Sequence, residues 1–590
     1  MQHMPQPRPY LSYSAVELED VAEETSDAAC LRAILNELAF RSTQKARNLE
    51  TQLKARLERL SGGAPEAPRT GIVVSLPVST ASSRSPRGGE VPPPAFAPTD
   101  EQSAALEKFK SGESLKISAF AGSGKTSTLQ LMAAARPRRG LYLAFNKKIA
   151  NEAASRFPSN VDCRTTHSVA ARAIRSQHAY SKDKMFTRIG AMQLAAELEL
   201  KPRIFGDAMK LTPPQQAFLF QATLRRFCQS SAPVVDSSHV VAAQRFLGLP
   251  PDVQIEARRW VLAEAQALWK RMTSAADALP LGHDGYLKLW ALGQPRLDYD
   301  YILLDEAQDT NFVVLDVLTS QPAQMVYVGD RYQQIYEWRG AVNAMEKIET
   351  AHEAALTQSF RFGDTIASAA SAVLRGLGES RPIRGNPKRT SRILDFGEAD
   401  AVLARTNAAV MAEALGALSS NKRPFIVGGT DELKRLVGDV FSLMEGNPGT
   451  HPDFFGFKNW DEVVEFAQAE EGEDLKPFVT LVQIHGPRAL WAAIANAVSE
   501  EAGADICLST AHKAKGCEWP SVRLADDFSA QLDEGGSVPE SEARLFYVAM
   551  TRAKDTLVVD PQLLAAFKSG VPNRRDGSRH GGAQWAEGLF

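Results

Sequence analysis

Short, continuous apolar runs divide the chain into strand candidates. In the first half they begin at Leu115 and cover Tyr301–Leu304 and Met325–Val328. In the second half they cover 401–404, 425–427, 506–509, 522–525 and 556–559. Runs of this length, separated by segments with helical periodicity, are typical of parallel strands that are buried on both faces. The pattern therefore predicts an α/β protein with two parallel-sheet domains.

The N-terminal part of the chain shows a different pattern. Residues 27–60 carry apolar positions at helical spacing, which predicts one or two amphipathic helices in an N-terminal appendage, residues 1–60. Residues 61–98 are rich in Pro, Gly and Ser and lack periodicity, so we expect a flexible linker there. Residues 566–590 are expected to form a loose tail. The appendage is a candidate docking site for a protein partner.

Two insertions are expected within the sheet-forming parts. The first sheet domain spans 99–345, and helical periodicity over about 172–298 predicts a helical insertion in it. The second spans 346–565, with a short helical insertion at about 430–504. Both insertions lie between strand candidates, so each should leave and re-enter its sheet.

Composition excludes several classes of protein. The chain has 590 residues and a formal net charge of −3, so bulk charge does not indicate a nucleic-acid binder and any such site must be a local groove. Its five cysteines show no C-x-x-C pairing, which favours a reducing compartment. The first residues lack an apolar signal region, and no run is long enough for a membrane span. A cytoplasmic protein without membrane association is expected.

The stretch "SAFAGSGKTST" is the strongest chemical signal. It sits between an apolar strand and a helix start, which is the context of a phosphate-binding loop. Backbone amides of the loop would surround phosphate oxygens, Lys125 would reach the terminal phosphates, and Thr126 would ligate Mg²⁺. Ala119 replaces the first glycine of the usual pattern, which a negative φ would tolerate. The expected loop residues are Ala121, Gly122, Ser123, Gly124, Lys125, Thr126 and Ser127.

An acidic pair ends the strand in "YILLDEAQD". Asp305 could hold Mg²⁺ and Glu306 could polarise the attacking water, so together they predict a hydrolase. An acidic turn at a strand end is the bland alternative, but the preceding phosphate loop makes it the weaker reading.

A third strand ends in "GDRYQQIYEWRGA". Gln333 stands where a polar side chain could sense the γ-phosphate. Tyr336 and Trp338, with Arg339 beside them, could stack on unpaired bases, an interaction worth roughly 1–3 kcal/mol per base. A single aromatic here would more simply be a core residue, whereas the whole string favours single-stranded nucleic acid.

These segments occur in a familiar order. Together with "TDEQ", "TTHS", "LTQSFR", "LSTAHKAKGCEWP" and "FYVAMTRAK", they resemble superfamily 1A helicases of the UvrD/Rep/PcrA type, over about residues 99–560. The segment "GHDGYLKLW" is similar to the F-box DNA helicase branch. No F-box is evident in residues 1–60, so a ubiquitin-ligase role is not inferred.

The resemblance implies an architecture and an activity. It implies two RecA-like domains with a helical 1B insertion and a reduced 2B insertion, binding ATP and Mg²⁺ between them. It also implies an ATP-dependent DNA helicase or translocase in DNA repair, recombination or phage defence. The substrates would be single-stranded DNA and 3′-tailed duplex, with 3′→5′ movement.

The resemblance also assigns residues. Gln102 would bind the adenine edge, Arg361 and Arg552 would reach the γ-phosphate from the second domain, and Glu518 would couple the nucleotide and DNA sites. A planar guanidinium suits the charge that develops on a leaving phosphoryl group. The implied DNA contacts are Thr165, Thr166, His167, Tyr336, Trp338, Arg339, Thr510 and His512.

Some positions depart from the family pattern and two alternatives remain. The departures are at Arg331, Tyr332, Phe362, Lys513 and Cys517. None of them removes a catalytic group, so they bear on how DNA is held and on how the nucleotide and DNA sites are coupled.

A P-loop kinase or small NTPase is one alternative function, but it would lack the arginine motifs and the aromatic string. A DNA-activated ATPase switch that clamps nucleic acid and recruits a partner is the other, and the sequence leaves it open.

Overall fold

A computed structural model describes most of the chain from residue 97 onward. The described ranges are 97–206, 209–240, 250–336, 343–447, 457–468, 475–531 and 538–569, with Gly449, His451, Phe454 and Gly472 between them. The chain divides into two units, Met1–Gly89 and Glu90–Phe590. In the first unit only Ile34, Leu35, Leu38 and Leu53 are described, all helical. The predicted linker, apart from residues 97 and 98, and nearly all of the predicted tail lie outside the described residues.

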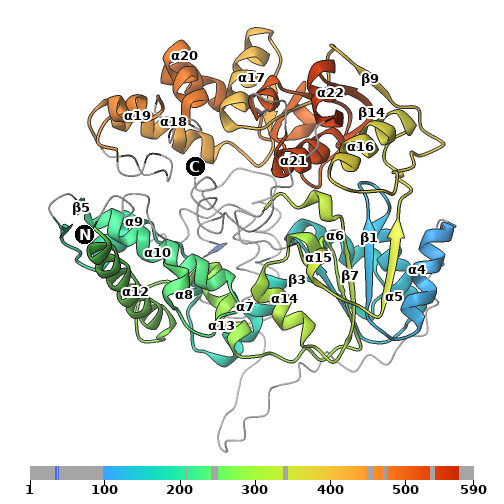
Figure 1. Ribbon diagram of the computed structural model, residues 1–590, viewed down its shortest axis with the longest axis horizontal. Helices are drawn as coiled ribbons and strands as arrows, with labels where there is room; N and C mark the ends of the chain where they lie inside the picture. Colours follow the sequence, from blue (N-terminus) through green and yellow to red (C-terminus); the bar gives the residue numbers. More distant parts are fainter. Residues whose placement is uncertain are drawn as a thin grey trace, which may run out of the picture. The chain divides into compact units, whose positions relative to one another are not determined.

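Six parallel strands form the first sheet, in the order β3-β2-β6-β7-β1-β8. Figure 1 labels β1, β3 and β7 among them. Their bounds are β1 (Leu115–Ala119), β2 (Gly140–Ala144), β3 (Val161–Thr165), β6 (Tyr301–Leu304), β7 (Gln324–Gly329) and β8 (His352–Leu356). In the register, Leu115 lies opposite Val326 on one side and His352 on the other. Because β2, β6 and β7 are buried along their whole length, they read as continuous apolar runs.

Helices cover both faces of this sheet. One face packs against α4 (Asp100–Lys110), α5 (Lys125–Ala135) and α6 (Lys147–Arg156). The other packs against α7 (Thr166–Gln177), α13 (Gly282–Leu292), α14 (Phe312–Thr319) and α15 (Ala344–Lys347). The result is a three-layer α/β/α domain, which places the loops after β1, β6 and β7 at one edge of the sheet.

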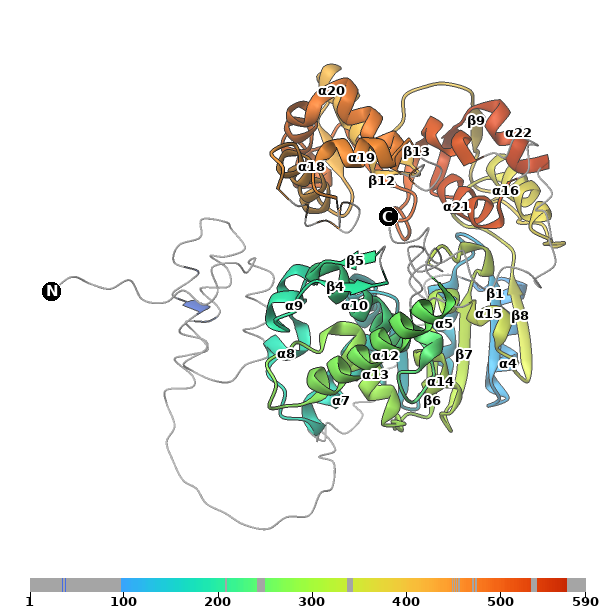
Figure 2. The ribbon, with the colours of Figure 1, turned by 60° about the vertical axis from the view of Figure 1, so that its left-hand side comes forward.

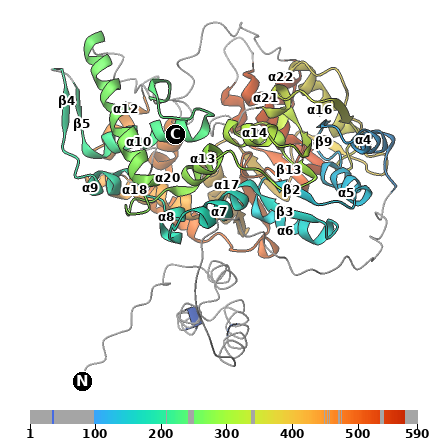
Figure 3. The ribbon, with the colours of Figure 1, turned by 90° about the horizontal axis from the view of Figure 1, so that it is seen from below.

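The chain between α7 and α13 is helical and has a core of its own. It contains α8 (Lys182–Phe186), α9 (Ala191–Glu197), α10 (Pro213–Gln229) and α12 (Pro251–Thr273). An antiparallel hairpin of β4 (Arg203–Phe205) and β5 (Met209–Leu211) joins α9 to α10. In Figure 3, α7, α8 and α13 lie to the left of β2 and β3, and α13 contacts both of the other helices.

The second sheet is also parallel and six-stranded, in the order β11-β12-β10-β13-β14-β9. Its strands are β9 (Arg392–Leu394), β10 (Ala401–Ala404), β11 (Pro424–Ile426), β12 (Ile506–Thr510), β13 (Trp519–Leu524) and β14 (Ala553–Val558). The prediction of an α/β fold with two parallel-sheet domains is therefore confirmed. We refer to the two sheets with their helices as the first and second lobes.

Helices again cover both faces of the second sheet. On one face lie α16 (Asp364–Gly376), α21 (Glu540–Met550) and α22 (Pro561–Ser569). On the other lie α17 (Asn407–Ser419), α18 (Asp431–Met444), α19 (Trp460–Phe466) and α20 (Lys476–Ala495). Helices α18, α19 and α20 appear together in Figure 2. Helix α20 is kinked at Gly486, whose φ of 74° and following proline interrupt the helical hydrogen bonds. The helices α18–α20 thus share one core with β10 and β12 of the second sheet.

Candidate nucleotide and nucleic-acid site

The phosphate loop is built by two glycines in the left-handed conformation. Gly122 has φ 70° and Gly124 has φ 78°, and Gly124 begins α5 without a side-chain cap. The first amides of α5 therefore have no capping side chain and are positioned to donate to an anion. Ala119, in contrast, is the last residue of β1 and pairs with Leu356, so it occupies ordinary strand backbone. This geometry explains why alanine fits where the usual pattern has glycine.

Lys125 and Glu306 form an ion pair at the mouth of this loop. Lys125 Nζ lies 2.7 Å from Glu306 Oε1, and both side chains are largely buried. Burial alone would lower the pKa of Lys125, but Glu306, Asp305 and Asp330 together raise it. Burial likewise opposes ionisation of Glu306, yet Lys125 and Lys515 lower its pKa to about 2. Both groups are therefore charged at neutral pH.

Glu306 also has an unusual backbone. It stands between β6 and the short helix η2 (Ala307–Asp309), with a φ of 52°. A non-glycine residue in this region is strained, and such strain is concentrated at functional positions. The strained turn directs the Glu306 carboxylate toward Lys125.

Thr126 and Asp305 provide an oxygen-rich pair beside the loop. Thr126 Oγ1 donates to Asp305 Oδ2 at 3.4 Å, and the Tyr142 hydroxyl donates to the same oxygen at 2.7 Å. Burial, reinforced by the nearby Glu306, raises the pKa of Asp305. A hydroxyl and a carboxylate facing each other suit Mg²⁺, which prefers oxygen ligands and relieves the cost of burying the carboxylate charge. Tyr142 was not identified from the sequence.

Two arginines of the second lobe lie near the phosphate loop. A Cβ added at Gly122 would lie 2.6 Å from Arg361 Cβ, so the backbone carrying Arg361 touches the loop. Arg361 Nε donates to Glu518 Oε2 at 2.8 Å, and its Nη1 donates to the Thr551 carbonyl at 2.9 Å. Arg552 is buried, and burial together with repulsion from Arg361 lowers its pKa to about 9. The structure therefore brings Arg361, Arg552 and Glu518 together in one cluster.

Gln102 and Phe360 flank the other side of the loop. A Cβ at Gly124 would lie 3.1 Å from Gln102 Nε2 and 3.2 Å from a ring carbon of Phe360. Gln102 forms a capping box with Thr99 and donates to Thr128 Oγ1 at 3.1 Å. Phe360 is 44 % exposed and so offers a ring face beside the loop. The only sequence signal for Phe360 is its place directly before Arg361.

The structure brings Tyr336 and His512 together from different lobes. The Tyr336 hydroxyl donates to the His512 carbonyl at 2.9 Å. On the other side, the Tyr336 ring stacks on Phe145, with ring centroids 5.7 Å apart and an interplanar angle of 17°. Phe145 is 41 % exposed and was not identified from the sequence. Trp338 and Arg339, the other members of the predicted aromatic string, lie outside the described residues.

The remaining predicted DNA contacts are more dispersed. Thr165 caps α7, its hydroxyl oxygen accepting from Ser168 N at 3.2 Å, and Thr166 is the first residue of that helix. His167 belongs to another aromatic group, with its ring centroid 6.0 Å from Tyr286 on α13. Thr510 is buried at the end of β12. The role of these residues in binding DNA stays a prediction.

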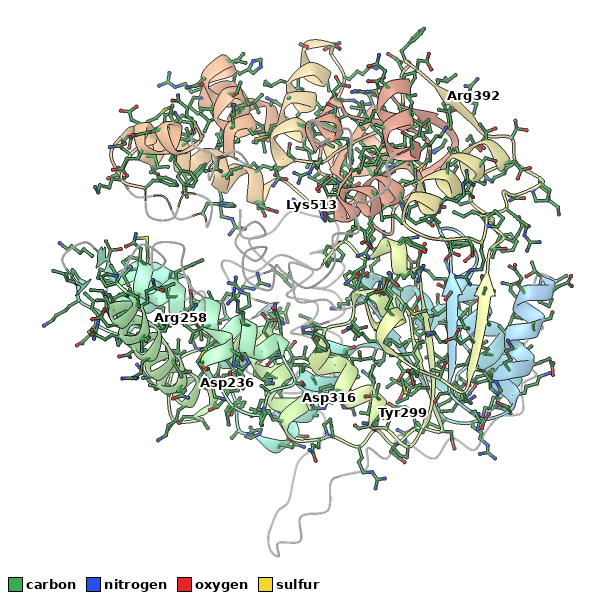
Figure 4. All side chains as sticks on the ribbon, in the orientation of Figure 1. Asp236, Arg258, Tyr299, Asp316, Arg392 and Lys513 are labelled. Atoms are coloured by element: carbon green, nitrogen blue, oxygen red, sulfur yellow. The ribbon has the colours of Figure 1, made fainter. Side chains whose placement is uncertain are left out.

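The unusual positions in the motifs have structural roles. Arg331 lies over the Tyr332 ring at 4.6 Å, and Phe362 is fully buried in the second-lobe core. Lys513, labelled in Figure 4, forms an ion pair of 2.8 Å with Glu432 and ties the loop after β12 to α18. The Cys517 carbonyl accepts from Arg552 Nη1 at 3.5 Å. These contacts show how the departures fit the fold.

The fold and the loop together define a class of protein. One sheet carries a phosphate loop with an acidic pair, and the other supplies two arginines next to it, which is the arrangement of two-lobed P-loop proteins. The described residues contain no helix with the length and apolar character needed to cross a bilayer.

Comparisons with known proteins identify similar domains and relatives. Residues 263–352 match the UvrD/REP helicase N-terminal domain, and residues 458–561 match the UvrD-like helicase C-terminal domain. F-box DNA helicase 1 of Gallus gallus is 30% identical over 79% of this chain and 49% of its own length. F-box DNA helicase protein 1 of Schizosaccharomyces pombe is 30% identical over 80% of this chain and 58% of its own length. The ATP-dependent DNA helicase PcrA of Leuconostoc citreum is 32% identical over 15% of this chain and 13% of its own length.

The chain therefore contains UvrD-like helicase domains, and its similarity to F-box DNA helicases extends over about four fifths of its length. It spans about half the length of the curated relatives that it matches along most of its own length.

Proposed function

We propose that this protein is an ATP-dependent DNA helicase or translocase that moves along single-stranded DNA. The observation that carries the proposal is the meeting of two half-sites. The first lobe contributes the phosphate loop and the Lys125–Glu306 pair, and the second contributes Arg361 against Gly122. A site divided in this way makes nucleotide hydrolysis depend on how the lobes are held, which is what a motor requires.

Each side chain then has a task in hydrolysis. Lys125 binds the terminal phosphates, and Glu306 holds and polarises the attacking water once Lys125 has turned to the nucleotide. Arg361 and Arg552 neutralise the charge that develops on the transferred phosphoryl group. Gln102 and Phe360 bind the base, the first through its amide and the second through its exposed ring face. Thr126 and Asp305 would hold Mg²⁺, which supplies charge neutralisation between the phosphates.

Single-stranded DNA would be held by aromatic rings near the lobe boundary. Phe145 and Tyr336 form a stacked pair with one partly exposed face, and stacking on bases is independent of sequence. Trp338 and Arg339 would extend this surface, and Thr165, Thr166, His167, Thr510 and His512 would contact phosphates and sugars. Since the Tyr336 hydroxyl donates to the His512 carbonyl, movement between the lobes would alter the grip on the strand.

Direction, cellular role and partners also belong to the proposal. The printed names of the relatives are those of DNA helicases, which supports DNA as the substrate. We infer 3′→5′ movement from family resemblance, a role in repair, recombination or phage defence, and a cytoplasmic location. Residues 27–60 would recruit a protein partner.

A strand-separation assay tests the proposal. Fluorescently labelled duplexes with a 3′ tail, a 5′ tail or blunt ends would be mixed with the full chain and ATP. The proposal expects strand release from the 3′-tailed duplex only, and no release by the Lys125→Ala variant. Release from the 5′-tailed duplex alone would mean that the protein moves in the 5′→3′ direction. Inactivity on every duplex would contradict the proposed unwinding.

A second candidate function is a DNA-activated ATPase switch without processive unwinding. One observation favours it: α18–α20 share a core with the second sheet, so this insertion covers the lobe that carries it. ATP hydrolysis that responds to single-stranded DNA, with no strand release from a long 3′-tailed duplex, would support the switch. Displacement of streptavidin from a biotinylated single strand would then show whether the protein still translocates.

A further inference from the structure

Tyr547 crosses from the second lobe to the phosphate loop. It lies on α21 and is fully buried. Its hydroxyl oxygen accepts from the backbone N–H of Ala121 at 3.1 Å, and its O–H donates to Asp330 Oδ2 at 2.8 Å. One phenol therefore joins the loop that follows β1 to the carboxylate that follows β7.

Protonation of the phenol fixes the direction of these bonds. Burial, followed by the charge of Asp330, raises the pKa of Tyr547 well above its ordinary value. The phenol therefore keeps its proton at neutral pH and donates a hydrogen bond to Asp330 Oδ2. The same Asp330 oxygen accepts from Gln333 Nε2 at 2.8 Å, so Tyr547 and Gln333 share one acceptor.

Asp330 continues the path to the acidic pair. Its backbone N–H donates to Gln308 Oε1 at 3.1 Å, and Gln308 Nε2 in turn donates to Glu306 Oε2. Gln308 can approach so closely because residue 329 is glycine: a Cβ there would lie 2.4 Å from Gln308 Oε1. Three successive hydrogen bonds therefore connect the phenol of the second lobe with the carboxylate of Glu306.

The same turn of helix also holds Arg552. The Thr551 N–H donates to the Tyr547 carbonyl at 3.2 Å, the Arg552 N–H donates to the Ala549 carbonyl at 3.1 Å, and Arg552 Nε donates to the Val548 carbonyl at 2.9 Å. Anchoring Tyr547 against Ala121 therefore fixes the position of Arg552 with respect to the phosphate loop.

We propose that Tyr547 is a positioning residue whose hydroxyl sets the register between the lobes, aligning Arg552, Gln333 and Glu306 for hydrolysis. The inference rests on the proposed function and deepens it. It assigns the coupling to the uncharged hydroxyl of Tyr547, in addition to the charged arginines. The two hydrogen bonds of its hydroxyl go to protein groups, the Ala121 N–H and Asp330 Oδ2.

Tyr547→Phe removes the hydroxyl and keeps the ring. Tyr301→Phe is the matched control, because Tyr301 is an equally buried tyrosine whose hydroxyl accepts from Asn160 Nδ2 at 3.2 Å. With saturating single-stranded DNA, Tyr547→Phe should lower kcat for ATP hydrolysis about tenfold or more while KM for ATP changes less than about threefold. The control should keep kcat and KM near those of the unaltered protein. A thermal melt of each variant checks that both fold.

A double-mutant cycle shows whether the hydroxyl acts through Asp330. If it does, the losses of kcat in Tyr547→Phe and Asp330→Asn should be strongly non-additive, whereas Tyr301→Phe combined with Asp330→Asn should be additive. A kcat for Tyr547→Phe equal to that of the unaltered protein, or fully additive losses, would overturn the inference.

Hydrogen exchange separates this inference from the proposed function. Tyr547→Phe should speed exchange in the peptide that contains Ala121 about fivefold or more, and Tyr301→Phe should not. This readout does not need ATP hydrolysis. An unaltered protein that fails to hydrolyse ATP would contradict the proposed function, while unchanged exchange at the loop would contradict the role of Tyr547.

Discussion

The loops that follow β1 and β10 are the same structural unit put to different uses. Both connect an inner strand of a parallel sheet to a helix. After β1, two left-handed glycines open the loop and α5 begins with no side-chain cap. After β10, the N–H groups of Arg405 and Thr406 donate to the Asp527 carboxylate at 2.8–3.0 Å. The Thr406 hydroxyl oxygen also caps α17 by accepting from Ala409 N at 3.1 Å.

The difference shows which feature would let an ordinary strand-to-helix loop bind a phosphate. Amides at the start of a helix require an anion or another acceptor, whichever lobe they belong to. In the second lobe the chain supplies that acceptor itself, with Asp527. In the first lobe the amides at the start of α5 have no side-chain cap, and under the proposed function an external phosphate would be their acceptor, with Arg361 and Arg552 contributed by the second lobe.

Lys125→Ala should have the largest effect. The phosphates lose the one cation of the loop, so ATP hydrolysis with saturating single-stranded DNA should fall by about 1000-fold or more. Lys110→Ala is the control, because Lys110 is an exposed residue at the end of α4 that pairs with Glu107. If Lys125→Ala hydrolysed ATP near the unaltered steady-state rate, the first-lobe loop would not be the site that binds the phosphates for hydrolysis.

Removing either arginine should come next. Arg361→Ala or Arg552→Ala should lower kcat about 100- to 1000-fold and change the affinity for ATP much less, since the guanidinium groups act on charge that develops in the transition state. Arg389→Ala, which breaks an exposed pair with Asp555, serves as the control. Loss of ATP affinity with kcat unchanged would instead mean that the arginines clamp the ground state.

Gly122→Ala should have an intermediate effect. The new Cβ would lie 2.6 Å from Arg361 Cβ at a φ of 70°, so both strain and a clash would separate the arginine from the loop. We expect kcat to fall about tenfold or more. Gly112→Ala isolates the clash, because Gly112 has φ 88° but nothing within 4 Å of its added Cβ. Equal kcat losses in the two variants would mean that backbone strain, and not the clash with Arg361, lowers kcat.

Asp527→Ala should have the smallest effect on activity. The amides of Arg405 and Thr406 lose their acceptor, which should cost about 1–3 kcal/mol in the free energy of unfolding. KM for ATP should stay unchanged, because this loop binds no nucleotide. Asp526→Ala, at the exposed neighbouring position, controls for the loss of charge. A large increase in KM for ATP in Asp527→Ala would mean that the second-lobe loop takes part in nucleotide binding.

The sequence predicted several strands that carry continuous apolar runs, but not β2, which is also such a run. The strands at 301–304 and 401–404 were predicted with the bounds that β6 and β10 have. The edge strands β3 and β8 were not identified separately, because "VDCRT" and "HEAAL" carry polar and half-buried positions. An edge strand needs fewer apolar residues, so periodicity describes it poorly.

The candidate site also contains some residues that the sequence could predict and others that it could not. Residues adjacent in sequence, such as Gly124, Lys125 and Thr126, could be recognised from the strand–loop–helix context. Tyr142, Phe145 and Tyr547 could not, since each gains its place through a contact distant in sequence: with Asp305, Tyr336 and Asp330 respectively. No local pattern records such pairings, and only the folded arrangement of the sheets reveals them.

ATP hydrolysis measured against the concentration of single-stranded DNA tests the central claim most directly. The full chain, in Mg²⁺ and saturating ATP, would be titrated with oligo(dT), with Lys125→Ala as the blank. If the two lobes form one site controlled by the strand, the rate should rise saturably with DNA and stay at the blank level in the variant. A rate that is flat across the titration, or a DNA-dependent rise that persists in Lys125→Ala, would contradict the account.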